Sequence, residues 1–576
     1  MLEMVNSSIS PMRRRVLGLE SSAILGATLA LLVTAGVILL QLKFRTGQYE
    51  PDAVPIFYRL FLFEDYPASY LFLGALVLAG VPAVQRAAVL TATLMGKHPV
   101  LVSLVALAVF AAGSVWVYHA HPLSMDEAAP YMQSKIFAAG RLVGSYPPEL
   151  IDWLVPPSFQ NYFIGVSRET GEIASSYWPG FAMLLTPFMF LGVPWLCNPV
   201  LGACSVWVTH RLALRLTNSA EAAGAAALIS FASAAFVLNS ISFYSMTAHL
   251  LCNAVFLLLL LTPTPRRAFL AGLVGGLALT LHNPVPHMLF AVVWIGWLMA
   301  HKNRWVLLAA LVAGYLPWIV VVGFGWYFLL RSLAAGETSG IASGTGGYLD
   351  AILSLVTSAF RAPDENLLWA RAIGLSKFWL WAAPLSIVLA AVGFWRHRRD
   401  HRIQLLLASF VLTFVGYLLV PLNQGHGWGF RYLHSVWFAV PVLAAAAFVP
   451  SRNGAPSEPS PCVPWALAGA LGGALIMVPY FAWQVHRFMD AHLAQLPRAN
   501  SGRAEVMLIN VYTGYYNQDL VQNDPFLRER PIRLVTHGRV DDERMLAEHF
   551  PDLVQLERNR RGSIWGYPVA GDSNRH

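Results

Sequence analysis

Apolar runs of about 20 residues recur along the chain, and they constrain its fold more than any other feature of the sequence. A helix of that length crosses the hydrocarbon core of a bilayer. Only 12% of the 576 residues are charged, whereas soluble domains have about 25%. We therefore predict an all-α polytopic membrane protein with about 13 transmembrane helices. The expected spans are 22–42, 68–84, 100–118, 198–216, 221–239, 242–261, 268–281, 288–300, 305–328, 378–395, 403–420, 433–449 and 464–485.

Two parts of this assignment stay open from the sequence. The run 181–191 is too short to cross alone, so we expect it at the membrane interface. The short pair 268–281 and 288–300 makes either two full crossings or one hairpin that does not cross. The orientation of the other spans is the same in both cases, because the pair changes the count by two.

Lys and Arg are concentrated in alternate short loops, a pattern that places those loops in the cytoplasm. With the N-terminus inside, the inner loops contain Arg13, Arg14, Arg15, Arg86, Lys97, Arg211, Arg215, Arg266, Arg267, Lys302, Arg304, Arg396, Arg398, Arg399, Arg402 and Arg452. Most of the outer turns contain few basic residues or none. We expect the segments after 118, 328 and 420, and the C-terminal tail, to be extracytoplasmic.

We divide the chain into three parts. Residues 1–99 are N-terminal membrane helices, and residues 100–490 are a transmembrane catalytic region with outer loops 119–180 and 331–377. Residues 491–576 form an extracytoplasmic C-terminal domain.

Two of the outer segments have recognisable local patterns. The Gly/Ser-rich stretch 336–347 precedes an amphipathic run, 348–360, and is expected to be mobile, as lid loops are. In the tail, strand-like patterns near 505–511 and 532–535 and a helical pattern at 543–550 predict a small α/β fold.

An adjacent acid pair, Asp126 and Glu127, lies a few residues beyond the third apolar run. One interpretation is structural: Ser124-Met-Asp-Glu127 fits a capping box, and acids in a first helical turn favour the positive end of the helix dipole. This accounts well for Glu127 and less specifically for Asp126. Carboxylates near lipid are costly unless they reach water or carry a function. We expect Asp126 to be the chemical centre, on a helix that the cap fixes.

Two further outer stretches have residues suited to a ligand. The first, 167–180, ends in Tyr177-Trp-Pro-Gly180, which is either part of a site or an interfacial aromatic belt before a helix. The second, 423–432, is glycine-rich and contains His426 and Arg431. Glycines let a backbone approach a ligand closely, and a guanidinium suits a phosphate. The alternative is a flexible turn with a snorkelling arginine.

The histidines and cysteines indicate less. His119 and His121 are two residues apart, His282 and His287 are five apart, and His249 lies inside a span. None of these spacings is a strong metal-ligand pattern. The four cysteines form no CxxC pattern or disulfide framework. The net charge of +8 does not indicate nucleic-acid binding, because the basic residues mark short loops.

These motifs together resemble the GT-C superfamily of integral-membrane glycosyltransferases, nearest to the protein O-mannosyltransferases and lipid A aminoarabinose transferases. The resemblance covers roughly 100–449. It rests on Ser-Met-Asp126-Glu127-Ala-Ala-Pro-Tyr, Ser-Tyr177-Trp-Pro-Gly-Phe, Pro-Trp-Leu-Cys-Asn-Pro and Gly-Phe-Arg431-Tyr432-Leu. Two features depart from close relatives: Trp178 replaces the first proline of the usual Tyr-Pro-Pro-Gly, and two spans precede the acid-bearing one.

The resemblance implies a polyprenyl-phosphate sugar donor and an active site on the outer face of the plasma (bacterial inner) membrane. Asp126 is then the general base, and Glu127 supports it or orients the acceptor. Arg431, with His426 or Lys377, holds the donor phosphate. The other expected substrate-binding residues are Tyr177, His249 and Tyr432, and Glu172 is a minor candidate.

In-line attack on such a donor predicts inversion at the anomeric carbon. A divalent cation, Mg or Mn, is left open; if one binds, Asp126 and Glu127 are its expected ligands. The expected partners are the lipid-linked donor, a lipid, glycan or protein acceptor, and membrane lipids. The alternatives are a transporter or flippase of lipid-linked sugars and a ligase that joins lipid-linked glycans.

Overall fold

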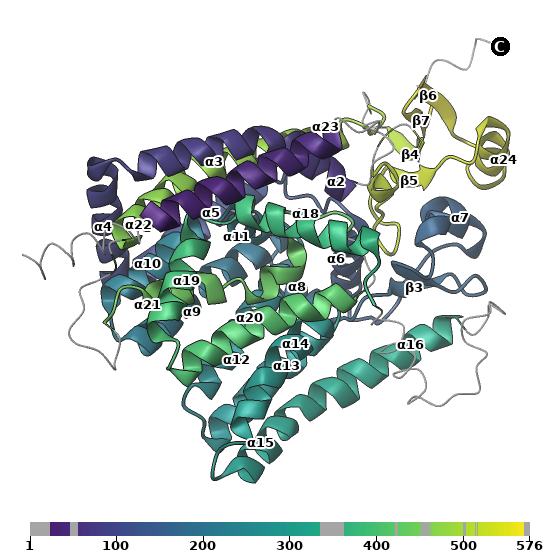
Figure 1. The fold of residues 1–576 in the computed structure, drawn as a ribbon. Coiled ribbons are helices and arrows are strands. Elements are labelled where there is room, and N and C mark those ends of the chain that lie inside the picture. Colours follow the sequence, from purple (N-terminus) through teal and green to yellow (C-terminus); the bar gives the residue numbers. More distant parts are fainter. Residues whose placement is uncertain are drawn as a thin grey trace, which may run out of the picture.

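The structure is a computed structural model, and it describes residues 24–45, 56–334, 362–420, 424–450, 460, 462–498, 503–512, 514 and 516–568. Helices form one large bundle, and a small sheet lies at one end of it (Figure 1). The expectations for Arg13 to Arg15, for the stretches 336–347 and 348–360, and for Asn423 fall outside the described residues.

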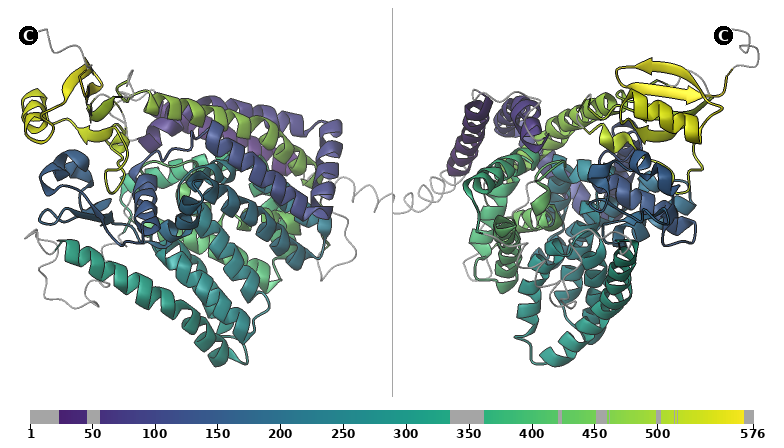
Figure 2. Two further views of the ribbon diagram at one scale, coloured as in Figure 1. Left: turned by 180° about the vertical axis from the view of Figure 1, so that it is seen from behind. Right: turned by 90° about the vertical axis from the view of Figure 1, so that its right-hand side faces the viewer.

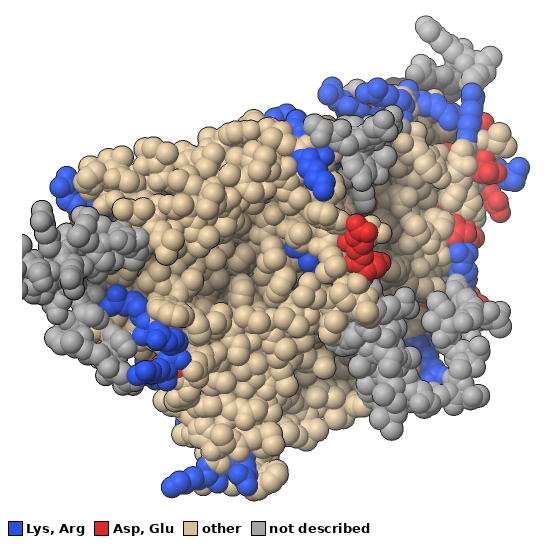
Figure 3. Space-filling view, in the orientation of Figure 1, with Lys and Arg blue, Asp and Glu red and all other residues tan. Residues whose placement is uncertain are grey.

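Among the residues that the structure describes, six helices are long and apolar enough to cross a membrane, or eight if each of two bent pairs is one span. They are Ile24–Arg45, Ile56–Ala79, Pro99–Trp116, Arg304–Ala334, His401–Leu419 and Cys462–Leu493. On the face shown in Figure 3, a broad uncharged surface separates charged side chains at the two ends of the molecule. The chain is therefore a multi-pass membrane protein, while the expected count of about 13 spans is not confirmed.

The N-terminal part contains a helix that the sequence did not predict. After Ile24–Arg45, the segments α2 (Ile56–Arg59), η1 (Leu60–Glu64) and α3 (Asp65–Ala79) run on as one span. The next residues, expected as an inner loop, form α4 (Pro82–Lys97), which lies across one end of the bundle before α5 (Pro99–Trp116) (Figure 1). α4 packs closely on α10 (Ala220–Phe231), because a Cβ on Gly224 would lie 1.9 Å from the carbonyl oxygen of Ala92.

The central helices follow in chain order. They are α8 (Gly180–Phe190), α9 (Cys197–Thr217), α10, α11 (Ala234–Ile241), α12 (Met246–Leu260), α13 (Pro265–Thr280), α14 (Val285–Leu298), α15 (Arg304–Pro317), η5 (Trp318–Phe324) and α16 (Gly325–Ala334). The later ones are α18 (Glu365–Trp381), α19 (Ser386–His397), α20 (His401–Leu419), η6 (Arg431–Val436), α21 (Ala439–Ala446), α22 (Cys462–Gly472), η7 (Gly473–Met477) and α23 (Val478–Leu493).

Several expected spans are broken or short. The run 221–239 is a pair of helices, α10 and α11, bent by 66°. The break occurs where the Ser233 hydroxyl accepts from Phe236 N at 3.3 Å and so begins a new helix. The short pair 268–281 and 288–300 corresponds to α13 and α14. α13 packs closely along α15, because a Cβ on Gly272 would lie 2.1 Å from the carbonyl oxygen of Leu311. An apolar run thus does not guarantee one continuous helix.

The segment after α5 folds into a cap of helices and a small sheet. Its elements are α6 (Met125–Ala138), β1 (Gly144–Ser145), η2 (Pro148–Leu150), α7 (Ile151–Leu154), η3 (Pro157–Phe159), β2 (Ile164–Val166) and β3 (Glu172–Ser175). α6 ends where Gly140 takes a φ of +73°, a left-handed conformation that glycine adopts without steric cost. The strands pair antiparallel in the order β1-β3-β2, a sheet that the sequence did not predict.

Three elements of the C-terminal segment lie near the predicted positions: β4 (Ala504–Ile509), β5 (Ile532–Val535) and α24 (Arg539–His549). The sequence did not predict the other three, which are η8 (Gln518–Leu520), β6 (Val554–Asn559) and β7 (Gly562–Gly566). The sheet order is β5-β4-β7-β6, in which only β4 and β5 are parallel, with Leu508 opposite Leu534. Figure 2 shows this sheet beside the cap that contains α6. Buried side chains of both parts, Met132 and Leu534 among them, share one apolar core.

Candidate active site

Glu127 begins α6 through the capping box that the sequence predicted. Its side chain reaches back to the N–H of Ser124 at 3.4 Å, the residue in front of the helix. The same carboxylate accepts from Leu123 N at 2.7 Å and from Phe243 N at 2.8 Å, and the hydroxyl of Tyr118 donates to it at 2.9 Å. Glu127 is fully buried, so it fixes the start of the helix and ties it to the chain before α12.

Asp126 points to a different set of partners. Its carboxylate receives Arg431 Nη1 at 2.6 Å and the hydroxyl of Tyr177. The side chains of Asp126 and Arg431 are 16% and 19% exposed, so the ion pair is shielded but reachable. Three separate segments meet here: the first turn of α6, the residues before α8 and the start of η6. The structure therefore brings together the best candidates of all three sequence motifs.

The charge of Asp126 is set by a balance of burial and pairing. Burial alone would raise the pKa of Asp126, but Arg431, His282 and the Tyr177 hydrogen bond outweigh it, and the pKa lies below its usual value. Glu127 is in no ion pair among the described residues, and its partners are N–H and O–H groups. Burial dominates there and raises the pKa of Glu127 to about 7, although its backbone donors act in the opposite direction. The two adjacent acids thus have different environments, with Asp126 ionised and Glu127 easily protonated.

Three residues that the sequence reasoning missed complete the surroundings. The ring of His282, between α13 and α14, lies 4.1 Å from the ring of Tyr177. Tyr244 and Ser124 share a hydrogen bond of 2.9 Å between their hydroxyl groups. Asp519, from η8, accepts from Met125 N at 2.6 Å, and burial raises the pKa of Asp519 to about 8. No local pattern marks these residues, because each is isolated in the sequence and reaches the site through tertiary packing.

The remaining candidates lie around this centre without touching Asp126. His426 is buried among aromatic rings, with the ring of Trp428 at 4.7 Å and that of Phe488 at 5.3 Å, and neither of its ring nitrogens has a hydrogen-bond partner among the described residues. Tyr432 stacks on Tyr417 at 4.5 Å and lies under the guanidinium of Arg371.

Lys377 and His249 are placed further inside the bundle. The ammonium of Lys377 pairs with Asp65 at 2.8 Å, and both side chains are completely buried. Its charge is therefore committed to a partner that the sequence did not indicate, and not to the Asp126–Arg431 pair. His249, in α12, is buried, and within the described ranges neither of its ring nitrogens has a hydrogen-bond partner. Glu172, the minor candidate, is hydrogen-bonded to Thr170 at the end of β3.

The expected cation ligands do not form a ligand cluster with a third group. Asp126 is committed to Arg431 and Tyr177, and the oxygens of Glu127 accept N–H and O–H groups. Within the part of the chain that the structure describes, three metal-ligating side chains converge only at His119, His486 and Asp490.

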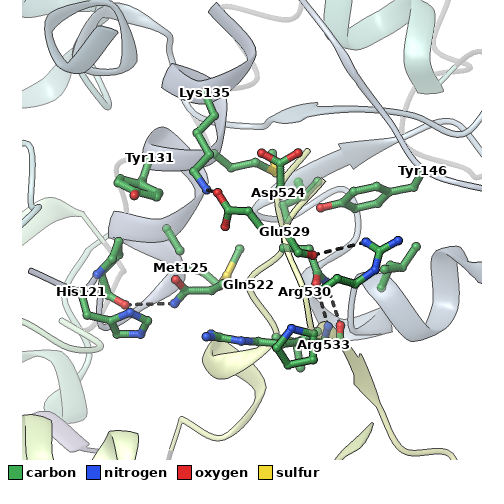
Figure 4. Close-up of a pocket in the computed structure, with 18 of the residues that line it drawn as sticks. His121, Met125, Tyr131, Lys135, Tyr146, Gln522, Asp524, Glu529, Arg530 and Arg533 are labelled. Carbon is green, nitrogen blue, oxygen red and sulfur yellow. Dashed lines mark hydrogen bonds and ion pairs between the residues drawn. The ribbon is translucent and has the colours of Figure 1, made fainter. Parts of the chain in front are cut away.

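A polar cavity of about 190 Å³ lies beside the first turns of α6, between that helix and the C-terminal segment (Figure 4). Met125 and Lys135 line it from α6, and Glu529, Arg530 and Arg533 line it from the other side. Lys135 pairs with Glu529 at 2.7 Å, and Arg530 pairs with Glu505 at 2.9 Å. The side chain of Arg533 has only a long contact of 3.4 Å to the carbonyl of Leu520 among the described residues. One cation of this cavity is therefore available to a ligand.

Comparisons with known proteins place the fold. No protein-family model and no curated protein matches the sequence. Among solved structures, the chain is similar to ArnT from Cupriavidus metallidurans bound to undecaprenyl phosphate, with a TM-score of 0.51 over 82% of this chain and 98% of that one, at 12% identity. The chain has the ArnT-type fold. The apo form of the same protein also matches, with a TM-score of 0.48 over 81% and 97% of the two chains, at 12% identity.

This likeness confirms, for the fold, the resemblance that the motifs indicated. The likeness extends over nearly all of ArnT and most of this chain. At 12% identity it concerns the fold, and the role of each side chain follows from the geometry above.

Proposed function

We propose that the protein is a membrane glycosyltransferase that moves a sugar from a polyprenyl-phosphate donor to an acceptor hydroxyl on the outer face of the membrane. The observation that carries this proposal is the Asp126–Arg431 pair, which joins a shielded carboxylate to a guanidinium at 2.6 Å. The ArnT structure of the same fold was solved with undecaprenyl phosphate bound. A base for the acceptor and a cation for the departing phosphate are the two groups that such a transfer needs.

The pair also provides a way to couple donor binding to the activation of the base. In the absence of donor, Arg431 neutralises Asp126 and keeps its pKa low, so the carboxylate is a weak base. A donor phosphate is a better partner for a guanidinium fork than one carboxylate oxygen. When Arg431 turns to the phosphate, the buried Asp126 loses its cation and its pKa rises. The base therefore becomes strong only when the donor is in place.

The chemical step then balances as a single displacement. Asp126 takes the proton of the acceptor hydroxyl, and the acceptor oxygen forms a bond to the anomeric carbon. The bond from that carbon to the phosphate oxygen breaks, and its electron pair leaves on the polyprenyl phosphate, whose charge Arg431 neutralises. Attack and departure on opposite faces invert the anomeric configuration. Tyr177 orients the carboxylate through its hydroxyl.

Two cavities suit the two substrates. An apolar cavity of about 600 Å³ lies between the N-terminal helix Ile24–Arg45 and helices α18, α19, α20 and α21, and Val37, Phe378 and Leu443 are among its lining residues. Such a cavity, lined almost entirely by apolar side chains, suits a polyprenyl tail. The face in Figure 3 is hollowed at its centre, and the surface around the hollow is mostly uncharged. The polar cavity beside α6 suits the acceptor, because Arg533 offers a charge for a polar or anionic group.

The orientation follows from the basic residues. With Lys and Arg of the short loops in the cytoplasm, α6 and the C-terminal sheet lie outside. The mixed charges at the sheet end of Figure 3, against mainly basic ones at the other end, support this arrangement. An outer site on the plasma (bacterial inner) membrane follows, where lipid-linked sugars and their acceptors meet.

A flippase of lipid-linked sugars is the second candidate, and two bent helix pairs favour it. α10 and α11 are bent by 66°, and α18 and α19 by 95°, and broken helices near the middle of a bundle are typical of transporters. The two functions can be separated with purified protein, because a glycosyltransferase releases polyprenyl phosphate without a membrane gradient and a flippase does not.

The test is turnover in detergent. Full-length protein with a polyprenyl-phosphate sugar and an acceptor extract is expected to release free polyprenyl phosphate, and Asp126→Asn is expected to release none above background. A deletion strain should accumulate the lipid-linked sugar, identified by mass spectrometry. Accumulation without any turnover by the purified protein would favour the flippase instead.

A further inference from the structure

A second cluster of chemically active side chains lies away from the Asp126–Arg431 pair. It joins the turn after α5 to the last membrane helix, α23. His119 comes from the turn, and His486 and Asp490 come from α23, one helical turn apart on the same face. Their ligand atoms all lie within 4.8 Å of one another. The local sequence pairs only His486 with Asp490, four positions apart, and does not indicate that His119, from a distant segment, joins them.

The distances match those of ligands on one ion. His119 Nε2 lies 2.9 Å from Asp490 Oδ1, and His486 Nε2 lies 3.3 Å from Asp490 Oδ2. Two ligands held at about 2.0–2.1 Å by a tetrahedral Zn²⁺ lie about 3.3 Å apart. The ring centroids of the two histidines are 5.0 Å apart. Two imidazoles on one such ion have centroids about 5 Å apart, so little rearrangement is needed for coordination.

A simple hydrogen-bonded ion pair explains the cluster less well. His119 Nε2 is within 2.9 Å of the carboxylate but lacks the alignment of a hydrogen bond, and no other described group accepts from it or donates to it. The backbone of the turn that presents His119 is also strained. His119 and Ala120 have φ values of +54° and +49°, which residues other than glycine rarely adopt. A ligand that holds the imidazole toward α23 gives a physical reason for this backbone.

The exposure of the three side chains leaves room for a water ligand and a path for an ion. His119 is 30% exposed, His486 is 39% exposed and Asp490 is 55% exposed. Three protein ligands with one open position are a common arrangement for Zn²⁺, and imidazole with carboxylate excludes Mg²⁺ as the preferred ion.

We propose that His119, His486 and Asp490 bind one divalent transition-metal ion of the Zn²⁺ class, with water in the fourth position. The ion clamps α23 to the turn in front of α6. α23 leads directly to the C-terminal sheet, and the turn leads to Asp126, so the clamp fixes the cap against the membrane helices. This inference does not depend on the proposed glycosyltransferase activity.

The experiment measures metal content of the full chain in detergent, purified with a tag that contains no histidine. After treatment with EDTA and loading with Zn²⁺ at micromolar concentration, elemental analysis is expected to find one Zn²⁺ per chain. His486→Gln and Asp490→Asn are expected to retain at least tenfold less. His98→Gln is the matched control, because His98 is an exposed histidine between α4 and α5, away from the cluster, and it should bind as the wild type does.

Two further measurements test the same three ligands. Co²⁺ in place of Zn²⁺ should give the strong visible absorption of a tetrahedral site, and Asp490→Asn should lose it. Zn²⁺ should raise the unfolding temperature of the wild type and not that of Asp490→Asn, an exposed and isosteric change that leaves the fold intact. Failure of the wild type to retain Zn²⁺, or undiminished retention by Asp490→Asn, would overturn the proposal. Loss of Zn²⁺ in His492→Gln with retention in His486→Gln would also contradict this ligand set.

Discussion

Asp126 and Arg431 lie 305 positions apart in the sequence, and their side chains meet at 2.6 Å. The contact joins the first turn of α6 to the start of η6, and most of the membrane helices lie between these two elements in the sequence. Burying an ion pair costs desolvation free energy. We therefore interpret the members of this pair as groups that bind a ligand.

Asp126→Asn is expected to lower the rate of sugar transfer by at least about 100-fold, because an amide cannot accept the acceptor proton. Donor binding should be retained, since Arg431 remains. The measurement is release of polyprenyl phosphate, with donor affinity measured separately. Tyr177→Phe is the matched variant and should lose less activity, because it removes only one hydrogen bond. Wild-type turnover in Asp126→Asn would remove this residue from the role of base.

Arg431→Lys is expected to weaken donor binding on the order of 10-fold, because a lysine keeps the charge but not the two-pronged contact with a phosphate. Affinity for a polyprenyl phosphate can be measured by the stabilisation that the lipid gives to the protein. Arg371→Lys is the control: it changes another buried arginine, whose side chain donates to the carbonyls of Tyr417 and Val420. Equal losses in both variants would show that the effect is not specific to the phosphate.

The pH dependence of the base should move when its cation is removed. Arg431 is the main group that lowers the pKa of Asp126, while burial raises it. In Arg431→Gln the burial is unopposed by that charge, so the pKa of Asp126 rises and the acid limb of kcat/KM shifts to higher pH. An infrared titration of the carboxyl band gives the same reading if residual activity is too low. An unchanged pKa would contradict the coupling of donor binding to base strength.

Stability should fall as pH rises, because Asp519 is buried in its protonated form. Its pKa is raised from 3.8 to about 8. A raised carboxyl pKa means that the folded state holds the proton more tightly, so its contribution is complete below pH 3.8 and is lost as pH increases to about 8. The slope is at most about 1.4 kcal/mol per pH unit. Asp519→Asn should flatten this dependence in thermal unfolding at pH 5 and pH 8, whereas an unchanged slope would argue against a protonated Asp519.

Glu127→Gln should affect folding more than chemistry. Gln can accept at only one side-chain atom, whereas Glu127 accepts from two backbone N–H groups and a tyrosine hydroxyl at less than 3 Å. An unsatisfied buried donor costs about 1–3 kcal/mol, so the unfolding temperature should drop. Donor binding by the folded fraction should persist, since Arg431 does not touch Glu127. A variant of wild-type stability that lost only catalysis would instead make Glu127 a direct participant in the reaction.

The sequence predicted the features that depend on local pattern. Apolar runs and low charge identified a membrane protein, the spacing Ser124 to Glu127 identified a capping box, and alternation in the tail predicted β4 and β5. The ordered motifs around Asp126, Tyr177 and Arg431 indicated a GT-C enzyme, and the ArnT-type fold agrees with it. These features succeed because periodicity, caps and motif order are written in neighbouring residues.

The number of spans could not be derived in the same way. Hydropathy measures how apolar a run is, but not where a serine cap such as Ser233 breaks it or how closely glycines such as Gly224 let helices pack. α4 was missed because its basic residues looked like those of a loop, although a helix at the end of the bundle can carry them too. Breaks and packing depend on neighbouring helices, which the local sequence does not specify.

What the sequence determined by itself is the class of protein, a multi-pass membrane protein. That Asp126 is the central carboxylate stays a prediction, and both statements rest on residue type and short spacing. What only the tertiary structure decided is which side chains meet. It committed Lys377 to Asp65, brought Asp519 and His282 to the site, and placed His119 against His486 and Asp490. The physical reason is that an ionic or coordinating contact depends on distances of a few ångströms between atoms, and distances between remote segments are fixed only when the helices pack.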